Sequence, residues 1–172
     1  MVASPVIAQQ SDRNDAKIAY ANESNLEIFV NQRSGFSNEP DNQTGTGFAL
    51  EVNSLHGVYF FKQLGIMAGP GLVFNFNEDF QAIPVVAQVK FHLFPHYRSG
   101  PFVLLNAGRN IRVGEFRGGN SAKLGLGYIF EGDGDIRYSV GFFRKTKEFT
   151  INTETNFNYQ TESLGLSVGI HF

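Results

Sequence analysis

The last nine residues of the chain alternate large apolar side chains with small or polar ones. In an extended strand, successive side chains point to opposite faces. One face of this segment would therefore carry Leu164, Leu166, Val168, Ile170 and Phe172. The other face would carry Gly165, Ser167, Gly169 and His171. A strand with one face in water would normally carry charged residues or threonine on that face. Small residues favour a cramped interior instead, with the apolar face turned toward lipid, and this pattern is typical of a small transmembrane β-barrel.

The composition agrees with a barrel and excludes several other classes of protein. The 172 residues are enough for one domain with eight strands. No segment approaches the roughly 20 apolar residues that a membrane helix needs, as expected when alternate residues face a lumen. The absence of cysteine excludes a disulfide framework and a thiolate metal site. The formal net charge of -2 gives no indication of a nucleic-acid partner.

The first 25 residues differ in pattern from the rest. Residues 2–10 resemble the end of a secretory signal peptide, with the small residues Val6 and Ala8 before an expected cleavage at Gln9. The alternative is a disordered tail without a targeting role. Residues 9–25 are polar and unpatterned, so we expect them to be mobile. We therefore assign residues 1–25 to a signal-peptide remnant and flexible tail, and residues 26–172 to a β-barrel domain.

Turn-forming residues divide the barrel domain into eight alternating segments. The predicted strands cover residues 26–31, 48–53, 64–74, 83–93, 103–113, 121–130, 136–142 with an extension to about 150, and 164–172. Arg109 interrupts the apolar face of the fifth segment. Connections near residues 60, 97 and 133 are short, whereas residues 34–46 and 152–158 form longer loops, as in barrels with short periplasmic turns. The sequence therefore predicts an all-β fold, an eight-stranded antiparallel up-and-down transmembrane β-barrel.

Aromatic residues gather near both ends of the predicted strands. The group near the short turns comprises Phe60, Phe61, Phe94, Tyr97, Phe102, Tyr128, Phe130 and Phe172. The group near the opposite ends comprises Phe74, Phe76, Phe80, Phe116, Phe142, Phe149 and Tyr159. Two aromatic bands suit the two interfaces of a membrane.

The predicted inward faces carry charged and titratable side chains. They are Glu27, Glu51, Lys90, His92, Arg112, Lys123 and Arg137. An eight-stranded barrel is only wide enough for its own side chains, and charges away from water must be paired. We therefore predict a polar network that plugs the lumen, rather than a conducting pore or a catalytic lumen.

No catalytic, cofactor-binding or metal-binding residues are predicted. The chain has histidines at positions 56, 92, 96 and 171. His96 lies in a predicted turn and His171 next to the last residue, and neither has a serine in a recognisable local signature. The inward Ser139 and Ser167 are explained by their small size. The acidic residues at positions 131, 133 and 135 fit a hairpin better than a calcium loop. We therefore expect a non-enzymatic protein without a cofactor. The alternatives are a soluble lipocalin-like barrel with an apolar ligand and a lipid-modifying outer-membrane enzyme.

One polar segment is the first place to look for a protein partner. Residues 144–151 are predicted to lie in solvent beyond the membrane, as a solvated loop, with an exposed hairpin as the alternative. A protruding edge of this kind could pair with another protein by strand addition.

The chain resembles the small eight-stranded outer-membrane barrels of the OmpA/OmpX type. More narrowly, it resembles the outer membrane β-barrel proteins of Bacteroidetes-type bacteria. The resemblance is carried by residues 64–71, 83–85 with 89–94, 100–103 with 106–108, and the terminal strand. It implies a monomer in the cell outer membrane, in contact with the lipid bilayer, whose external loops hold any surface ligand. It also implies that the apolar face of residues 164–172 is a signal for the outer-membrane insertion machinery.

Overall fold

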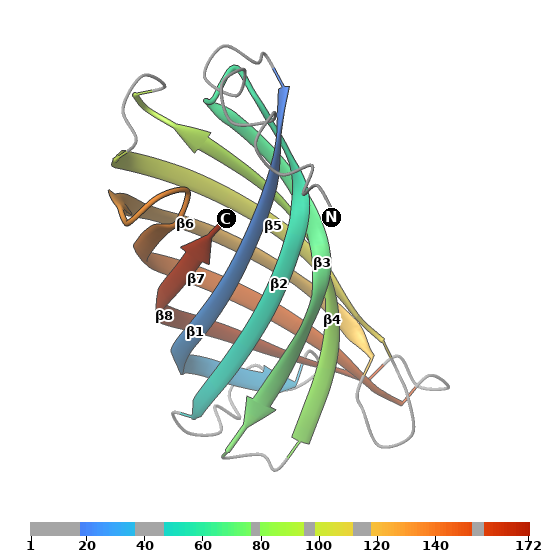
Figure 1. Cartoon of the computed structure of the whole chain (residues 1–172). Coiled ribbons are helices and arrows are strands. Elements are labelled where there is room, and N and C mark those ends of the chain that lie inside the picture. The colour runs from blue at the N-terminus through green and yellow to red at the C-terminus, as the bar shows by residue number, and fades with distance from the viewer. Residues whose placement is uncertain (1–17, 37–46, 77–79, 95–98, 112–117, 153–156) are drawn as a thin grey trace, which may run out of the picture.

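The computed structural model describes residues 18–36, 47–76, 80–94, 99–111, 118–152 and 157–172, and eight strands form one closed barrel (Figure 1). The strands are β1 (Ile18–Phe36), β2 (Phe48–Phe60), β3 (Leu64–Asn75), β4 (Phe80–His92), β5 (Gly100–Ile111), β6 (Gly119–Glu131), β7 (Arg137–Asn152) and β8 (Phe157–His171). Each strand pairs antiparallel with its neighbours in sequence, and β8 closes the barrel against β1. The predicted fold class is confirmed.

The strands are staggered around the barrel. Paired residues can be followed from Asn22 of β1 through every strand in turn, and the path returns to β1 at Arg33 rather than at Asn22. Such a stagger requires the strands to tilt relative to the barrel axis, as Figure 1 shows. The register therefore decides which inward side chains meet across the lumen.

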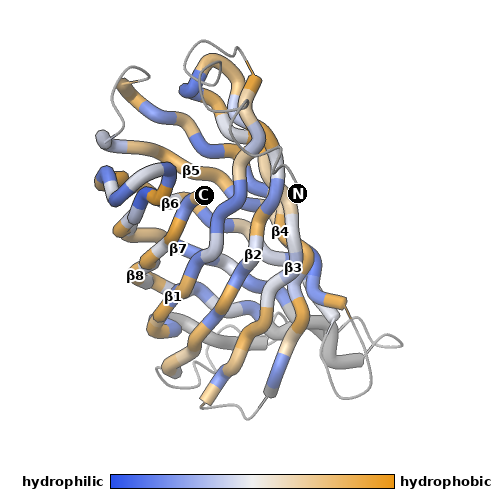
Figure 2. The backbone as a smooth tube through the Cα atoms, viewed as in Figure 1, coloured by the Kyte–Doolittle hydropathy of each residue, from blue (hydrophilic) through white to orange (hydrophobic). Residues whose placement is uncertain are grey.

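The alternation read from the sequence places apolar side chains on the outside. Every strand contributes large apolar residues at least 40% exposed, including Leu26, Val52, Leu72, Val85, Leu105, Leu126, Phe142 and Leu166. Hydrophobic and hydrophilic residues alternate along the strands in Figure 2. Within the described residues, no helix is long and apolar enough to cross a membrane.

The first strand is longer than the sequence predicted. β1 begins at Ile18 and ends at Phe36, so residues 18–25 are not part of a flexible tail and residues 34–36 are not part of a loop. This segment pairs with β2 from Ile18 onward, and from Glu23 onward it pairs with β8 as well. Its alternation was hidden because polar residues occupy both faces, with Glu23 and Asn25 inward and Ser24 outward. Residues 1–17, and with them the predicted signal-peptide remnant, lie outside the described residues.

Two of the predicted short turns are tight hairpins. Between β2 and β3, Phe61 and Lys62 both have positive φ, 51° and 57°, and Gln63 N–H donates to Phe60 O at 3.0 Å. Positive φ at both central positions matches the right-handed twist of the flanking strands. Between β6 and β7, Gly132 N–H donates to Ile136 O at 3.0 Å.

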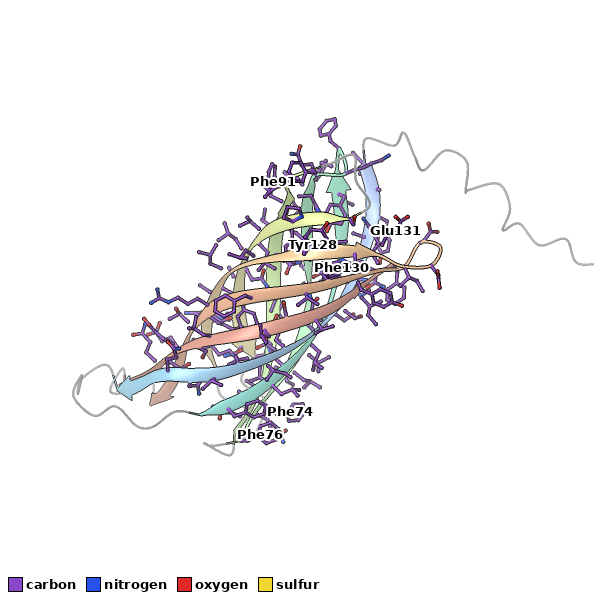
Figure 3. The ribbon with its side chains drawn as sticks, turned by 90° about the vertical axis from the view of Figure 1, so that its left-hand side faces the viewer. Phe74, Phe76, Phe91, Tyr128, Phe130 and Glu131 are labelled. Carbon is purple, nitrogen blue, oxygen red and sulfur yellow. The ribbon has the colours of Figure 1, made fainter. Side chains whose placement is uncertain are left out.

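The aromatic residues only partly follow the predicted bands. Phe74 and Phe76 lie toward one end of the barrel, and Phe91, Tyr128 and Phe130 lie toward the other (Figure 3). Phe102, however, is 2% exposed and points into the lumen. The prediction for Phe102 is wrong, because its register places it on the inward face opposite Gly127.

Candidate functional site

Two groups of buried polar residues occupy the lumen. The first, the carboxylate-pair cluster, comprises Glu27, Glu51, Lys123, Lys145 and Lys147. The second, the Glu23 cluster, comprises Glu23, Lys90, Ser139 and His171. All nine side chains are buried. Each of these side chains points inward because it occupies one of the alternate positions of its strand that face the lumen.

The carboxylate-pair cluster brings two like charges together. Glu27 and Glu51 are directly opposite in the β1–β2 ladder, and both are at most 1% exposed. Like charges in this arrangement repel each other. The structure offsets the repulsion with lysines from β7 and β6, which are the second and third strands from β1 around the closed barrel.

Lysine ammonium groups link the two carboxylates. Lys145 Nζ lies 3.2 Å from Glu27 Oε2 and 2.5 Å from Glu51 Oε2. Lys147 Nζ lies 3.0 Å from Glu51 Oε2, and Lys123 Nζ pairs with Glu27 Oε1. Three ammonium groups thus face two carboxylates, which leaves one positive charge in excess within the cluster.

Aromatic rings and an amide complete this cluster. Lys147 Nζ lies 4.5 Å from the ring centroid of Phe29, and Lys123 Nζ lies 5.2 Å from that of Phe143. Asn53 Nδ2 donates to Glu27 Oε1 at 3.2 Å and to Glu51 Oε1 at 3.1 Å. Ring faces attract cations when both are desolvated. The two ring faces therefore help to accommodate the excess positive charge.

The Glu23 cluster lies around the carboxylate that the sequence assigned to the tail. Lys90 Nζ donates to Glu23 Oε2 at 2.5 Å, and Asn25 Nδ2 donates to Glu23 Oε1 at 2.6 Å. His171 Nδ1 lies 3.3 Å from Glu23 Oε2, while His171 Nε2 lies 2.9 Å from Ser139 Oγ. Every titratable group in this cluster thus has a partner.

The order serine, histidine, carboxylate in this cluster is also that of a hydrolase triad. Three observations oppose a catalytic role. Ser139 is only 4% exposed. Its Oγ packs so closely on β8 that a Cβ atom at Gly169 would lie 2.6 Å away. Glu23 is already neutralised by Lys90. We therefore interpret Ser139, His171 and Glu23 as part of the lumen packing.

The structure places most of the predicted lumen residues inside the barrel. Glu27, Glu51 and Lys123 meet in the carboxylate-pair cluster, whereas Lys90 belongs to the Glu23 cluster. His92 is buried, and its Nε2 lies 3.1 Å from the Tyr59 hydroxyl. Arg137 is half-buried at the start of β7. Arg112 lies outside the described residues.

The predicted network left out five members of the two clusters. Glu23 lay in the assigned tail, and Ser139 and His171 were placed inward but not included in the network. Lys145 and Lys147 lay in the segment assigned to a solvated loop, but β7 continues to Asn152 and buries both side chains. That prediction is wrong for these lysines. The signal was present, because both continue the inward phase of Gly141 and Phe143.

Within the described residues, no group of three or more histidine, aspartate or glutamate side chains could hold a metal ion. Arg109 is exposed on the outer face of β5, where the sequence predicted an interruption of the apolar face.

Comparison with known proteins identifies the fold. No protein-family model matches the chain, and no curated protein matches it. Among solved structures, Neisserial surface protein A (NspA) is similar, with 12% identity over 88% of this chain and 97% of that chain, and a TM-score of 0.53. A designed transmembrane β-barrel is also similar, with 13% identity over 85% and 94% of the two chains, at a TM-score of 0.36. The similarity to NspA agrees with a closed eight-stranded antiparallel barrel.

Proposed function

We propose that this chain is a monomeric protein of the cell outer membrane, of structural or surface-binding type, whose lumen is closed by ion-paired side chains. The observation that carries the proposal is the division between the two faces of the barrel wall. Large apolar side chains are exposed on the outside of every strand, and charged side chains are buried within. This distribution suits lipid around the barrel.

The two lumen clusters support a plugged barrel rather than a pore. Removing one member of a buried ion pair typically costs about 3–5 kcal/mol. Opening a water path would have to separate several such pairs, including Lys90 with Glu23 and Lys147 with Glu51. An eight-stranded barrel has no spare width to hold these side chains apart. We therefore propose that the barrel itself does not conduct.

The soluble lipocalin-like alternative requires the opposite distribution. Such a barrel holds an apolar ligand within and meets water outside. Here the largest fully buried side chains include Lys90, Glu23, Glu27 and Glu51. In the described part of the lumen these charged groups lie between small apolar clusters, such as that of Phe29 and Phe143, whereas an apolar ligand would need a continuous apolar lining.

Membrane insertion and surface binding are assigned to different parts of the barrel. In this proposal, the insertion machinery reads the apolar face of residues 164–172, at the C-terminal end of β8, which comprises Leu164, Leu166, Val168, Ile170 and Phe172. Any surface ligand would be held by the connections at the opposite end, which follow β1, β3, β5 and β7.

Heat-modifiable migration on a denaturing gel tests the proposal. The full chain would be refolded with detergent or lipid vesicles, and in parallel in plain buffer. We expect a compact species that forms only with amphiphile and is lost on boiling. Complete folding in plain buffer would contradict the proposal and redirect the search to an internal ligand.

A further inference from the structure

A group of polar side chains lies on the outside of β1 and β2, within the apolar surface. This outer polar island comprises Tyr20, Asn22, Ser24, Ser54 and His56. Asn22 pairs with His56 and Ser24 with Ser54 in the β1–β2 ladder, so the side chains form one continuous patch.

Apolar residues border the island on its sides. Leu26 and Val52 form the next outward pair of the ladder, and both are exposed. Ile170 of β8 pairs with Ser24, and Ala68 of β3 pairs with His56. The island therefore lies at the edge of a lipid-facing surface, where its polar side chains can meet the ester groups of membrane lipids.

Three members of the island are already connected. His56 Nδ1 lies 2.8 Å from the Tyr20 hydroxyl, and His56 Nε2 lies 3.4 Å from Ser54 Oγ. The rings of Tyr20 and His56 are stacked, with centroids 6.4 Å apart. One imidazole is thus held between a phenol and a primary alcohol, the arrangement of an oriented base beside a nucleophile.

We propose that Ser54 and His56 form a lipid-facing site that hydrolyses carboxylic esters of membrane lipids, with Tyr20 as a positioning residue. This proposal goes beyond the proposed function and rests on its membrane location. In the tautomer that the role requires, His56 Nδ1–H donates to the Tyr20 oxygen, which leaves Nε2 free to accept a proton from Ser54. The Ser54–His56 distance of 3.4 Å fits the looser contacts found before substrate binds.

The reaction balances with water as the second substrate. Ser54 Oγ bonds to the ester carbonyl carbon while its proton passes to His56 Nε2. The carbon–oxygen bond to the alcohol part breaks, and the alcohol leaves with that proton. Water then attacks the acyl-serine and gives a proton to His56. The acyl–Oγ bond breaks, the carboxylic acid is released, and Ser54 recovers its proton from His56.

Asn22 is the side chain best placed to stabilise the developing oxyanion. It lies directly opposite His56, and its Oδ1 is buried without a hydrogen-bond partner. In the proposed site, the Nδ2 group of Asn22 would donate to the developing oxyanion. A donor of this kind typically accounts for a factor of about 10²–10³ in rate.

Hydrolysis can be measured on the full chain in lipid. The protein would be refolded into vesicles of phosphatidylethanolamine and phosphatidylglycerol with isotope-labelled acyl chains, and labelled fatty acid would be followed by mass spectrometry. We expect release by the wild type, and a loss of about a hundred-fold or more in Ser54→Ala and His56→Gln. Tyr20→Phe should lower kcat while leaving KM unchanged, because its hydroxyl orients the base without binding lipid.

Matched controls separate this site from the lumen. Ser24→Ala removes a hydroxyl from the same island but leaves the Ser54–His56 contact in place, and Ser139→Ala removes the lumen serine. Both should keep the wild-type rate. Loss of activity in Ser139→Ala together with full activity in Ser54→Ala would overturn the proposal, as would the absence of release above a boiled sample.

A covalent probe provides an independent readout. An alkyl fluorophosphonate in the same vesicles should add to Ser54 with loss of fluoride, and the mass shift should fall on the peptide that contains this residue. Labelling should be lost in His56→Gln and kept in Ser24→Ala. Equal labelling with and without His56 would overturn the role of this residue. A heat-modifiable barrel that neither hydrolyses lipid nor reacts would remove the hydrolase while leaving the proposed outer-membrane barrel intact.

Discussion

At the scale of single residues, the lumen depends on charge balance within a desolvated cluster. Glu51 accepts from Lys145 and Lys147, so Glu51→Gln would leave three lysines facing Glu27 alone. We expect a loss of about 3–5 kcal/mol in the free energy of unfolding, since the mutation leaves buried charge uncompensated. Urea unfolding in vesicles, followed by circular dichroism and by gel mobility, would measure it; the chain has no tryptophan to report by fluorescence.

Lys147→Met is the matched comparison for Glu51→Gln. It removes one lysine and leaves two lysines with two carboxylates, while Met keeps similar volume beside the Phe29 ring. We expect a markedly smaller loss than for Glu51→Gln, because the remaining charges balance. Equal losses for the two variants would show that packing, and not charge, dominates the cluster.

At the scale of strands, inward glycines make room for aromatic rings from neighbouring strands. A Cβ atom at Gly165 of β8 would lie 2.5 Å from Cζ of Phe143, and 2.6 Å from both Cβ of Phe29 and the backbone O of Ile28. Small residues facing large ones fill the interior of a small barrel. Gly165→Ala should therefore cost about 1–3 kcal/mol, the usual effect of overpacking.

Gly100→Ala is the control for this prediction, measured by the same unfolding assay. The nearest atom to a Cβ at Gly100 is 3.9 Å away, an ordinary contact, so we expect little change in stability. If both alanine variants lose the same stability, ring packing is not the reason for the glycine at position 165.

At the scale of the whole molecule, polar residues interrupt the apolar exterior on two opposite walls and at opposite ends. β2 and β6 run in the same direction and lie on opposite sides of the closed barrel. Outward polar residues fall in the second half of β2, at Ser54 and His56, but at the start of β6, at Asn120. Arg109 and Arg144 extend the second group onto β5 and β7. The apolar belt is therefore oblique, and we expect the barrel axis to be inclined to the membrane normal.

Arginine substitutions on the two walls test this inclination. Leu126→Arg on β6 should cost about 2–4 kcal/mol, the range for a midplane position, and Ser24→Arg on β1 about 0–1 kcal/mol, the range near an interface. Unfolding in vesicles measures both. Similar large losses would place Ser24 deep in the hydrocarbon and contradict an oblique belt. Because the chain has no cysteine, single spin labels at the same positions can report depth directly.

The sequence by itself was sufficient for the fold and for the two faces of most strands. Side-chain direction in a strand alternates with a period of two, which is a local property. The apolar residues of the last strand and the inward position of Lys123 could therefore be predicted without knowing any neighbour. The same local rule, applied further along β7, would have placed Lys145 and Lys147 inside as well.

Only the tertiary structure decided which side chains meet. Residues 18–25 form the first part of β1 because β2 and β8 supply their hydrogen-bond partners, although the hydropathy pattern of this segment is weak. The contacts of Glu27 with Lys123 and Lys145 depend on the stagger accumulated around the closed barrel. So does the contact of Glu23 with Lys90. Register and closure are relations between distant strands, and local alternation carries no information about them.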